Sequence, residues 1–117
     1  MGFAMPAAVG VQLAKPTEKV LCVSGDGGFQ MNIQELATAA EEQLNVKVIL
    51  LNNGHLGLVR QQQELFYGKR FSASRFHIEP DFAAIARGFG VAGYDLGEAD
   101  DPIEMLARAL STPGPAL

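Results

Sequence analysis

Cysteine is almost absent from this sequence, and long apolar runs and an excess of basic residues are missing altogether. The single Cys22 excludes a disulfide within the chain and suits a reducing compartment. No run approaches the roughly 20 apolar residues that a membrane-spanning helix needs. The formal charge of −4 leaves no basic footprint for nucleic acid. We therefore expect neither a membrane protein nor a nucleic-acid-binding protein.

The N-terminal segment also lacks the features of a signal peptide. Residues 1–13 are apolar and rich in alanine, but they have neither a basic flank nor a small-residue cleavage site. Together with the single cysteine, this predicts a cytoplasmic protein. The length of 117 residues suits one domain with a buried core, so residues 1–117 are predicted to form a single domain.

Two apolar, β-branched runs end in glycine and in oxygen-bearing side chains. Residues 20–24 lead into Gly-Asp-Gly-Gly (25–28), and residues 48–51 lead into Asn-Asn-Gly (52–54). Each run predicts a buried parallel strand whose carboxyl end opens into a loop, which is where open α/β sheets bind ligands. If the two strands are neighbours, Asp26 and the asparagine pair meet at one edge of the sheet.

A carboxylate and amide oxygens at one edge predict a site for a hard divalent cation. Mg²⁺ prefers such oxygens in an octahedral shell and often completes the shell with phosphate oxygens of a ligand. Gly25, Gly27 and Gly28 allow backbone N–H groups to approach an anion, and the helix that follows begins with its positive end toward it. The predicted ligand is a metal diphosphate.

Helix and strand signals alternate along the rest of the chain, without internal repeats. This alternation predicts a doubly wound parallel α/β sheet with helices on both faces, cut at both ends. The last helix should bury Ile103, Leu106, Ala107 and Leu110. Residues 68–80 show no periodicity and are expected to form a solvated loop or a subunit contact. Helical patterns occupy 2–13, 32–44, 56–67, 81–89 and 101–111, and short strands are expected at 91–96 and from 116 onward.

The pattern Gly88-x-Gly90-x-x-Gly93 matches the fingerprint of dinucleotide binding, but it stands in the wrong order. The fingerprint must follow a strand and open a helix, whereas these glycines close one helix and enter a short strand. We therefore interpret them as structural.

The triplet Gly-Asp-Gly (25–27), followed after 24 residues by Asn-Asn (52–53), resembles the thiamin diphosphate motif of enzymes that decarboxylate or ligate 2-oxo acids. Residues 1–10, 52–68 and 81–86 resemble, more narrowly, the C-terminal domain of the acetolactate synthase (acetohydroxyacid synthase) large subunit. The resemblance runs from end to end of the chain. It implies the thiamin diphosphate-binding fold of the type that holds the diphosphate.

The resemblance also implies which residues hold the cofactor and the metal. Mg²⁺ would be bound by Asp26, by Asn53 and by the backbone carbonyl of His55, whose side chain varies in the family and is not expected to be catalytic. Met1 resembles the bulky apolar residue that wedges beneath thiamin diphosphate and bends it. Cofactor contacts are assigned to Met1, Gly25, Asp26, Gly27, Gly28, Asn53, His55, Leu56, Gly57 and Leu58.

The implied parent enzyme decarboxylates pyruvate and condenses the product with a second 2-oxo acid, in branched-chain amino acid or acetoin-type metabolism. Its activating glutamate belongs to an N-terminal domain of a neighbouring subunit, so we expect no catalytic residue here and an inactive fragment. FAD, where present, would lie on a middle domain. A homo-oligomer and a regulatory small subunit are further implied partners.

Gln62 stands where many acetohydroxyacid synthases carry a tryptophan that is linked to a preference for 2-oxobutyrate over pyruvate. A glutamine at this position resembles the sequences of less selective enzymes of the family, or of enzymes that form only acetolactate.

Two alternatives to acetolactate synthase stay open at this point. One is another thiamin diphosphate-dependent decarboxylase, oxidase or carboligase of the same fold. The other is a truncated, non-catalytic interaction module. A degenerate copy would be expected to lose its metal ligands first, so the presence of Asp26 and Asn53 favours a functional parent.

Overall fold

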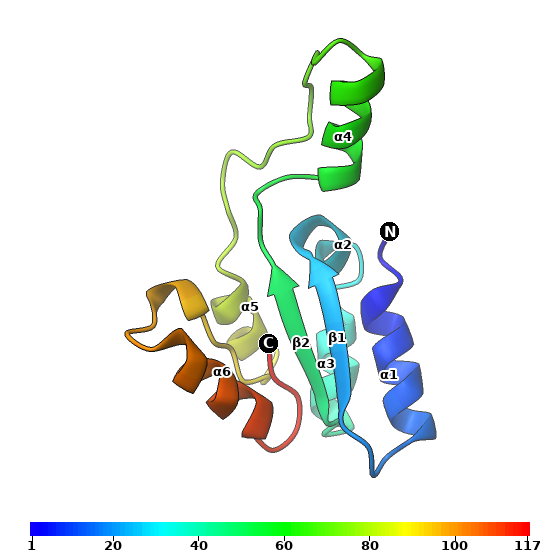
Figure 1. The fold of residues 1–117 in the computed structure, drawn as a ribbon. Helices are drawn as coiled ribbons and strands as arrows, with labels where there is room; N and C mark the ends of the chain where they lie inside the picture. Colours follow the sequence, from blue (N-terminus) through cyan, green and yellow to red (C-terminus); the bar gives the residue numbers. More distant parts are fainter.

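The computed structural model describes all 117 residues as an α/β fold built on two parallel strands (Figure 1). Strand β1 (Val20–Gly25) pairs with strand β2 (Val46–Leu51) in a register that runs from Val20 opposite Val46 to Gly25 opposite Leu51. The two predicted strands are therefore confirmed as neighbours. Their carboxyl ends lie side by side at one edge of the sheet.

Short backbone pairings extend this sheet beyond β2. Ala116 forms one parallel bridge with Lys47 and another with Ala92. The C-terminal residues therefore lie between β2 and the segment that follows Gly90. Both contacts are single bridges. Of the strands expected at 91–96 and from 116 onward, only Ala92 and Ala116 therefore form bridges.

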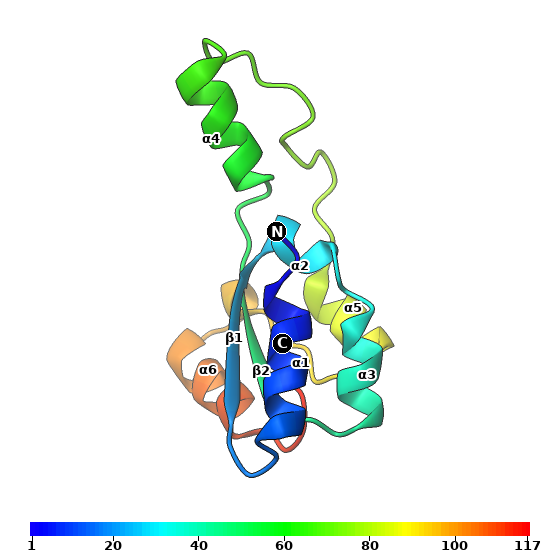
Figure 2. The ribbon, with the colours of Figure 1, turned by 90° about the vertical axis from the view of Figure 1, so that its right-hand side faces the viewer.

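Helices lie on both faces of the sheet, as the sequence predicts. Four helices cover one face, and α6 (Pro102–Ser111) lies on the other (Figure 2). The four are α1 (Ala4–Ala14), α2 (Asp26–Gln30), α3 (Glu35–Glu41) and α5 (Phe82–Gly88). A short 3-10 helix, η1 (Leu96–Glu98), precedes α6. None of the helices has both the length and the apolar character that a membrane crossing requires.

Helix α4 (Gly57–Phe66) projects away from the sheet and the other helices (Figures 1 and 2). It buries none of its residues. The loop that follows it contacts its side chains, with Arg60 over the ring of Phe71 and Gln63 donating to the carbonyl oxygen of Ser72. This loop, residues 68–80, runs back from the far end of α4 to α5 (Figure 1).

The core lies between the two strands and the four helices on one face. Its largest fully buried side chains are Phe29, Met5 and Leu36, and the ring of Phe29 meets that of Phe82 edge to face with centroids 6.0 Å apart. Burial of one such side chain stabilises a fold by about 1.5 to 3 kcal/mol. This packing connects α2, directly after β1, to α5 and so fixes the loop at the end of β1.

Two predicted helices differ from the observed ones. Helix α3 begins only at Glu35, because turns occupy residues 31–34. In α6, Ile103 is 80 % exposed and Ala107 is also exposed, so their predicted burial is wrong. The inward side of α6 carries Leu106, Ala109 and Leu110. Leu106 and Leu110, which were also predicted to be buried, are half-buried.

The three glycines of the apparent dinucleotide fingerprint have structural roles. Gly88 ends α5, and Gly90 follows it with a φ of +78°, a left-handed conformation that favours glycine. A Cβ atom at Gly93 would collide with the carbonyl oxygen of Ala83. These residues let the chain turn closely past α5, and they confirm the interpretation from sequence order.

Candidate functional site

The buried carboxylate of Asp26 joins the loops at the ends of the two strands. Asp26 is only 2 % exposed. Its Oδ1 atom accepts a hydrogen bond from the Gly27 N–H at 2.8 Å, and its Oδ2 atom accepts one from the Gly54 N–H at 2.8 Å. No lysine or arginine pairs with it, so its negative charge meets no full positive charge within the chain.

A cavity of about 260 Å³ opens beside this carboxylate. All ten residues to which the family resemblance assigns cofactor contacts line this one cavity. Two further lining residues, Met31 and Val59, were not predicted. Val59 could have been found from its place in the first turn of α4, whereas Met31 carries no local signal. The complete lining consists of Met1, Gly25, Asp26, Gly27, Gly28, Met31, Asn53, His55, Leu56, Gly57, Leu58 and Val59.

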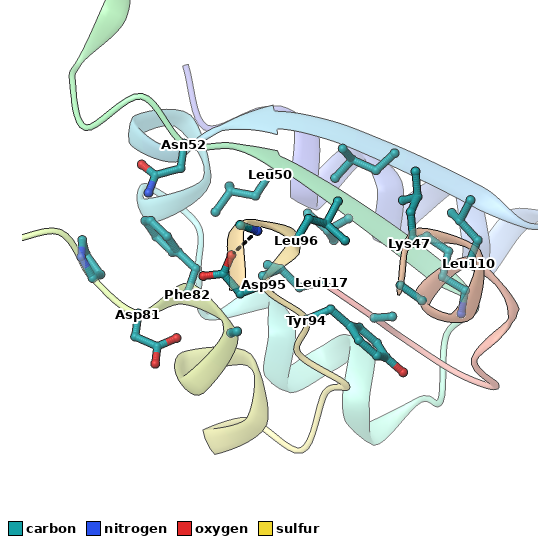
Figure 3. A pocket seen from close by; sticks show the side chains of 18 residues that line it. Lys47, Leu50, Asn52, Asp81, Phe82, Tyr94, Asp95, Leu96, Leu110 and Leu117 are labelled. Atoms are coloured by element: carbon teal, nitrogen blue, oxygen red, sulfur yellow. Dashed lines mark hydrogen bonds between the residues drawn. The ribbon is translucent and has the colours of Figure 1, made fainter. Parts of the chain in front are cut away.

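The side chains of the two asparagines that follow β2 line different cavities. Asn53 lines the cavity beside Asp26, and its Oδ1 atom accepts a hydrogen bond from the His55 N–H at 3.0 Å. Asn52 lines a different cavity (Figure 3), and its Oδ1 atom accepts from the Gly54 N–H at 3.2 Å. Asn52 and Asp26 accept from the same Gly54 N–H, so both asparagines lie at the expected edge of the sheet, but only Asn53 lines the cavity beside Asp26. Successive side chains of extended backbone point in opposite directions, which explains why the two asparagines line different cavities.

Gly27 leaves the space that a ligand would need between the two loops. A Cβ atom on Gly27 would lie 2.8 Å from Cδ2 of Leu56 and 3.7 Å from the carbonyl oxygen of His55. The carboxylate of Asp26, the amide oxygen of Asn53 and this carbonyl oxygen therefore belong to one small region. All three are hard oxygen donors of the kind that Mg²⁺ prefers, so the residues present fit the metal that the family implies.

The N-terminus of α4 borders the same cavity. The first residues of this helix, Gly57, Leu58 and Val59, line the cavity, and no side chain caps the helix at Leu56. The first N–H groups of a helix have no partner within it. Together with the helix dipole, such groups attract an anion. The cavity thus combines oxygen donors for a cation with N–H donors for a phosphate.

The sequence of the whole chain, residues 1–117, matches the family model described as "Thiamine pyrophosphate enzyme, C-terminal TPP binding domain". The chain belongs to this family.

Several curated acetolactate synthases are similar to this thiamine pyrophosphate enzyme domain over its full length. The acetolactate synthase isozyme 1 large subunit of Escherichia coli (strain K12) is 53 % identical over 117 residues, and the isozyme 2 large subunit is 45 % identical over the same length. The acetolactate synthase large subunit of Pyropia yezoensis is 46 % identical over 118 residues. The matches cover 100 % of this chain but only 21 %, 21 % and 20 % of these relatives, so the chain spans about a fifth of their length.

A solved structure shares the fold as well as the sequence. The thiamine diphosphate-dependent 4-hydroxybenzoylformate decarboxylase of Rhodococcus jostii RHA1 superposes with a TM-score of 0.85 at 31 % identity. The match covers 100 % of this chain and 22 % of the decarboxylase. It confirms the α/β fold predicted from the sequence as that of a thiamine pyrophosphate-binding domain.

In this thiamine pyrophosphate enzyme domain, each ring nitrogen of His55 has a hydrogen-bond partner. Its Nδ1 atom lies 2.7 Å from the carbonyl oxygen of Asn53, and its Nε2 atom lies 2.6 Å from Nη1 of Arg60. A carbonyl oxygen only accepts and a guanidinium only donates, so Nδ1 carries the proton and Nε2 accepts. Both ring nitrogens therefore have partners, in the loop and in the first turn of α4, which leaves neither free to act as a base.

Met1 and Gln62 differ in their relation to the cavity. Met1 lines the cavity but is 85 % exposed, so most of its side chain faces solvent. Gln62 is exposed on α4 and does not line the cavity. Its effect on the choice of substrate stays a prediction.

The loop of residues 68–80 supports the site through its backbone, which the sequence did not indicate. The Leu56 N–H donates to the carbonyl oxygen of Ser74 at 2.8 Å, and the Phe76 N–H donates to that of Gly54 at 2.9 Å. Ser74 is 2 % exposed and marks the point where this loop is anchored. The segment that follows β2 is therefore held from two sides, by Asp26 and by the returning loop.

Proposed function

We propose that this chain is the diphosphate- and Mg²⁺-binding domain of an acetolactate synthase. The observation that carries the proposal is the Asp26 carboxylate, which is 2 % exposed and has no cationic side chain beside it. A buried carboxylate without a cation is costly, and a bound metal would compensate its charge. Sequence identity of 40 to 53 % to acetolactate synthase large subunits over the full chain favours this enzyme within the family.

Each group around the cavity has a distinct part in holding thiamin diphosphate. Asp26, the side-chain oxygen of Asn53 and the carbonyl oxygen of His55 would bind Mg²⁺. The N–H groups of Leu58 and its neighbours at the start of α4 would bind the diphosphate oxygens. When bound, the cofactor supplies the electron sink for decarboxylation of a 2-oxo acid, while the residues of this chain anchor and orient it.

The remaining functions belong to the longer enzyme that we propose. Its other domains would supply the activating glutamate and, in some members, a site for FAD. Pyruvate and a second 2-oxo acid would be the substrates, within branched-chain amino acid biosynthesis. We further propose a cytoplasmic homo-oligomer, with a regulatory small subunit as a candidate partner.

Calorimetric titration of thiamin diphosphate into this chain tests cofactor binding. We expect binding with Mg²⁺ present and none with EDTA. Asp26→Ala removes the carboxylate and should abolish the metal-dependent binding, whereas Asp100→Ala removes an exposed carboxylate and should leave it unchanged. Equal affinity of the Asp26→Ala variant and the unmodified chain would reject the metal assignment.

A product assay tests the choice of enzyme separately. The full-length protein that contains this domain should form acetolactate from pyruvate and thiamin diphosphate. Release of an aldehyde without acetolactate would instead identify a 2-oxo acid decarboxylase. This result would leave the cofactor site in place and change only the reaction assigned to the parent.

A further inference from the structure

Arg60, in the first turn of α4, contacts both segments that flank this helix. Its Nη1 atom lies 2.6 Å from Nε2 of His55, which precedes the helix. Its guanidinium also lies over the ring of Phe71, with Cζ 5.4 Å from the ring centroid. One side chain therefore connects the loop after β2 to the loop of residues 68–80 that follows α4.

The imidazole of His55 extends this contact to the two residues that we propose as metal ligands beside Asp26. Its Nδ1 atom lies 2.7 Å from the carbonyl oxygen of Asn53, and the His55 N–H donates to Oδ1 of Asn53 at 3.0 Å. Two contacts thus fix His55 relative to Asn53. Arg60 in turn fixes the ring, and so restrains both the side-chain oxygen of Asn53 and the carbonyl oxygen of His55.

Packing contributes little to the position of these two ligands. Asn53 is exposed and His55 is only half-buried, and α4 buries none of its residues. Backbone bonds anchor the positions on either side, since the N–H groups of Gly54 and Leu56 donate to Asp26 and to the returning loop. The carbonyl oxygen of His55 accepts no backbone N–H group. Segments with few buried contacts open locally at a low cost in free energy, so the side-chain contacts of Arg60 matter here.

We propose that Arg60 is a positioning residue for the Mg²⁺ site and that it acts through the imidazole of His55. This inference rests on the proposed function of the Asp26 cavity, which Arg60 itself does not line. Replacing a group that orients a metal ligand typically lowers metal affinity by about 10- to 100-fold. The ring of Phe71 orients the guanidinium from its other side, so the returning loop takes part in the same arrangement.

The charge of Arg60 offers a different link to the cofactor, which the experiment must separate from positioning. An attraction between the guanidinium and the diphosphate would act without the His55 ring. Positioning through the ring would be lost together with the ring. The effects of replacing Arg60 and His55 are therefore additive if charge is responsible and not additive if positioning is responsible.

Calorimetric titration of thiamin diphosphate with Mg²⁺ compares the unmodified chain with Arg60→Leu, His55→Leu and the double variant. The substitution His55→Leu removes the ring and keeps the backbone carbonyl. Arg70→Leu is a matched control, because it removes an exposed arginine that donates to the carbonyl oxygen of Tyr67. A second series with Ca²⁺ tests the geometry of the site, since Ca²⁺ tolerates flexible coordination and Mg²⁺ demands a nearly ideal octahedron.

We expect Arg60→Leu to weaken binding with Mg²⁺ by about tenfold or more, and to weaken binding with Ca²⁺ less. His55→Leu should have a similar effect, and the double variant should bind no more weakly than either single variant. Arg70→Leu should bind as the unmodified chain does. The urea midpoints of all these chains without metal should agree, because the contacts of Arg60 lie outside the core.

Unchanged binding by Arg60→Leu would overturn the positioning role and leave the proposed function intact. Additive losses in the double variant would also overturn it, because Arg60 would then act independently of His55. Equal losses with Mg²⁺ and Ca²⁺ would show that the geometry of the metal ligands is not what Arg60 controls. Absence of binding by the unmodified chain would instead reject the proposed function, and the positioning role with it.

Discussion

Asp26 and Gly54 are 28 positions apart in the sequence, and the side chain of the first accepts the backbone N–H of the second at 2.8 Å. This bond joins the loop after β1 to the loop after β2. Gly54 has a φ of +66°, a left-handed conformation that favours glycine, and a Cβ atom there would lie 2.8 Å from Glu79. The bond therefore depends on both residue types, and it places the proposed metal ligands within one cavity.

The substitution Asp26→Asn should destabilise the chain even without a cofactor. An amide has one accepting oxygen, whereas the carboxylate of Asp26 accepts from both Gly27 and Gly54. The new amide NH₂ would face the N–H group of Gly27 or of Gly54. Although the Gly54 N–H keeps Oδ1 of Asn52 as a second acceptor, one bond to a buried charged oxygen would be lost, which costs about 1 to 3 kcal/mol. Urea denaturation without metal measures this loss. The exposed control Asp100→Asn should unfold at the same urea concentration as the unmodified chain, and an unchanged midpoint for Asp26→Asn would contradict the bonding described.

The substitution Gly27→Ala should weaken thiamin diphosphate binding by more than about tenfold while the chain stays folded. The new methyl group would lie 2.8 Å from the side chain of Leu56 and would push it into the cavity. Gly10→Ala is a matched control, because a Cβ atom at that helical position meets nothing within 4 Å. The control should bind normally and be more stable by about 0.5 to 1 kcal/mol. Calorimetric titration would contradict the prediction if both variants bound equally well.

The substitution Gly93→Ala should prevent folding. Its Cβ atom would collide with the backbone carbonyl of Ala83, and backbone atoms at that position cannot move without displacing α5. At Gly88 the same substitution meets nothing within 4 Å and should be tolerated. Circular dichroism separates the two variants. A folded Gly93→Ala variant with normal stability would show that the turn after α5 is less tightly packed than described.

The thiol of Cys22 should be protected from alkylation until the chain unfolds. Cys22 is 3 % exposed, and burial raises its pKa, so the reactive thiolate is disfavoured in the folded state. Iodoacetamide at pH 8 should label the native chain slowly and the chain in guanidinium chloride rapidly. Equal rates in the two conditions would show that β1 opens readily in the native state.

The same thiol should make stability depend on alkaline pH. A pKa raised in the folded state means that the folded chain holds its proton longer than the unfolded chain. The free energy of unfolding therefore falls as the pH rises above about 8.5 and through the folded pKa. Lys47 acts in the opposite direction, since burial, and then the charge of Lys19, lowers its pKa. Comparison with Cys22→Ala cancels the Lys47 contribution, and parallel pH profiles of the two chains would refute the prediction.

Local sequence patterns predicted the two strands and the loops that meet at their carboxyl ends. The runs that became β1 and β2 are apolar and β-branched, and each ends in glycine, so their local preferences already agree with buried parallel strands. Asp26 follows the first run and Asn53 the second, and parallel strands place such ends together. Asp81 and Asp101 each begin a helix by accepting a hydrogen bond from a backbone N–H group two or three residues further on, an interaction that acts within a short stretch of sequence.

The sequence failed where a position depends on distant partners. Periodicity favoured Ile103 for burial in α6, yet it is 80 % exposed, because what a helix buries depends on which side of it meets the sheet. Asn52 and Asn53 look equivalent in the sequence, and only the path of the backbone after β2 separates them into two cavities. The anchoring of the site by Ser74 has no local signature at all.

The sequence by itself determined the order of the elements, the glycines and oxygen-bearing side chains at the strand ends, and the family. These follow from backbone preferences and short-range hydrogen bonds, which act within a few residues. Only the tertiary structure decided which of those side chains share a cavity, how α6 is rotated, and that Ala116 lies as a strand between β2 and Ala92. Such arrangements minimise the free energy of the whole packed chain, so no short stretch of sequence contains them.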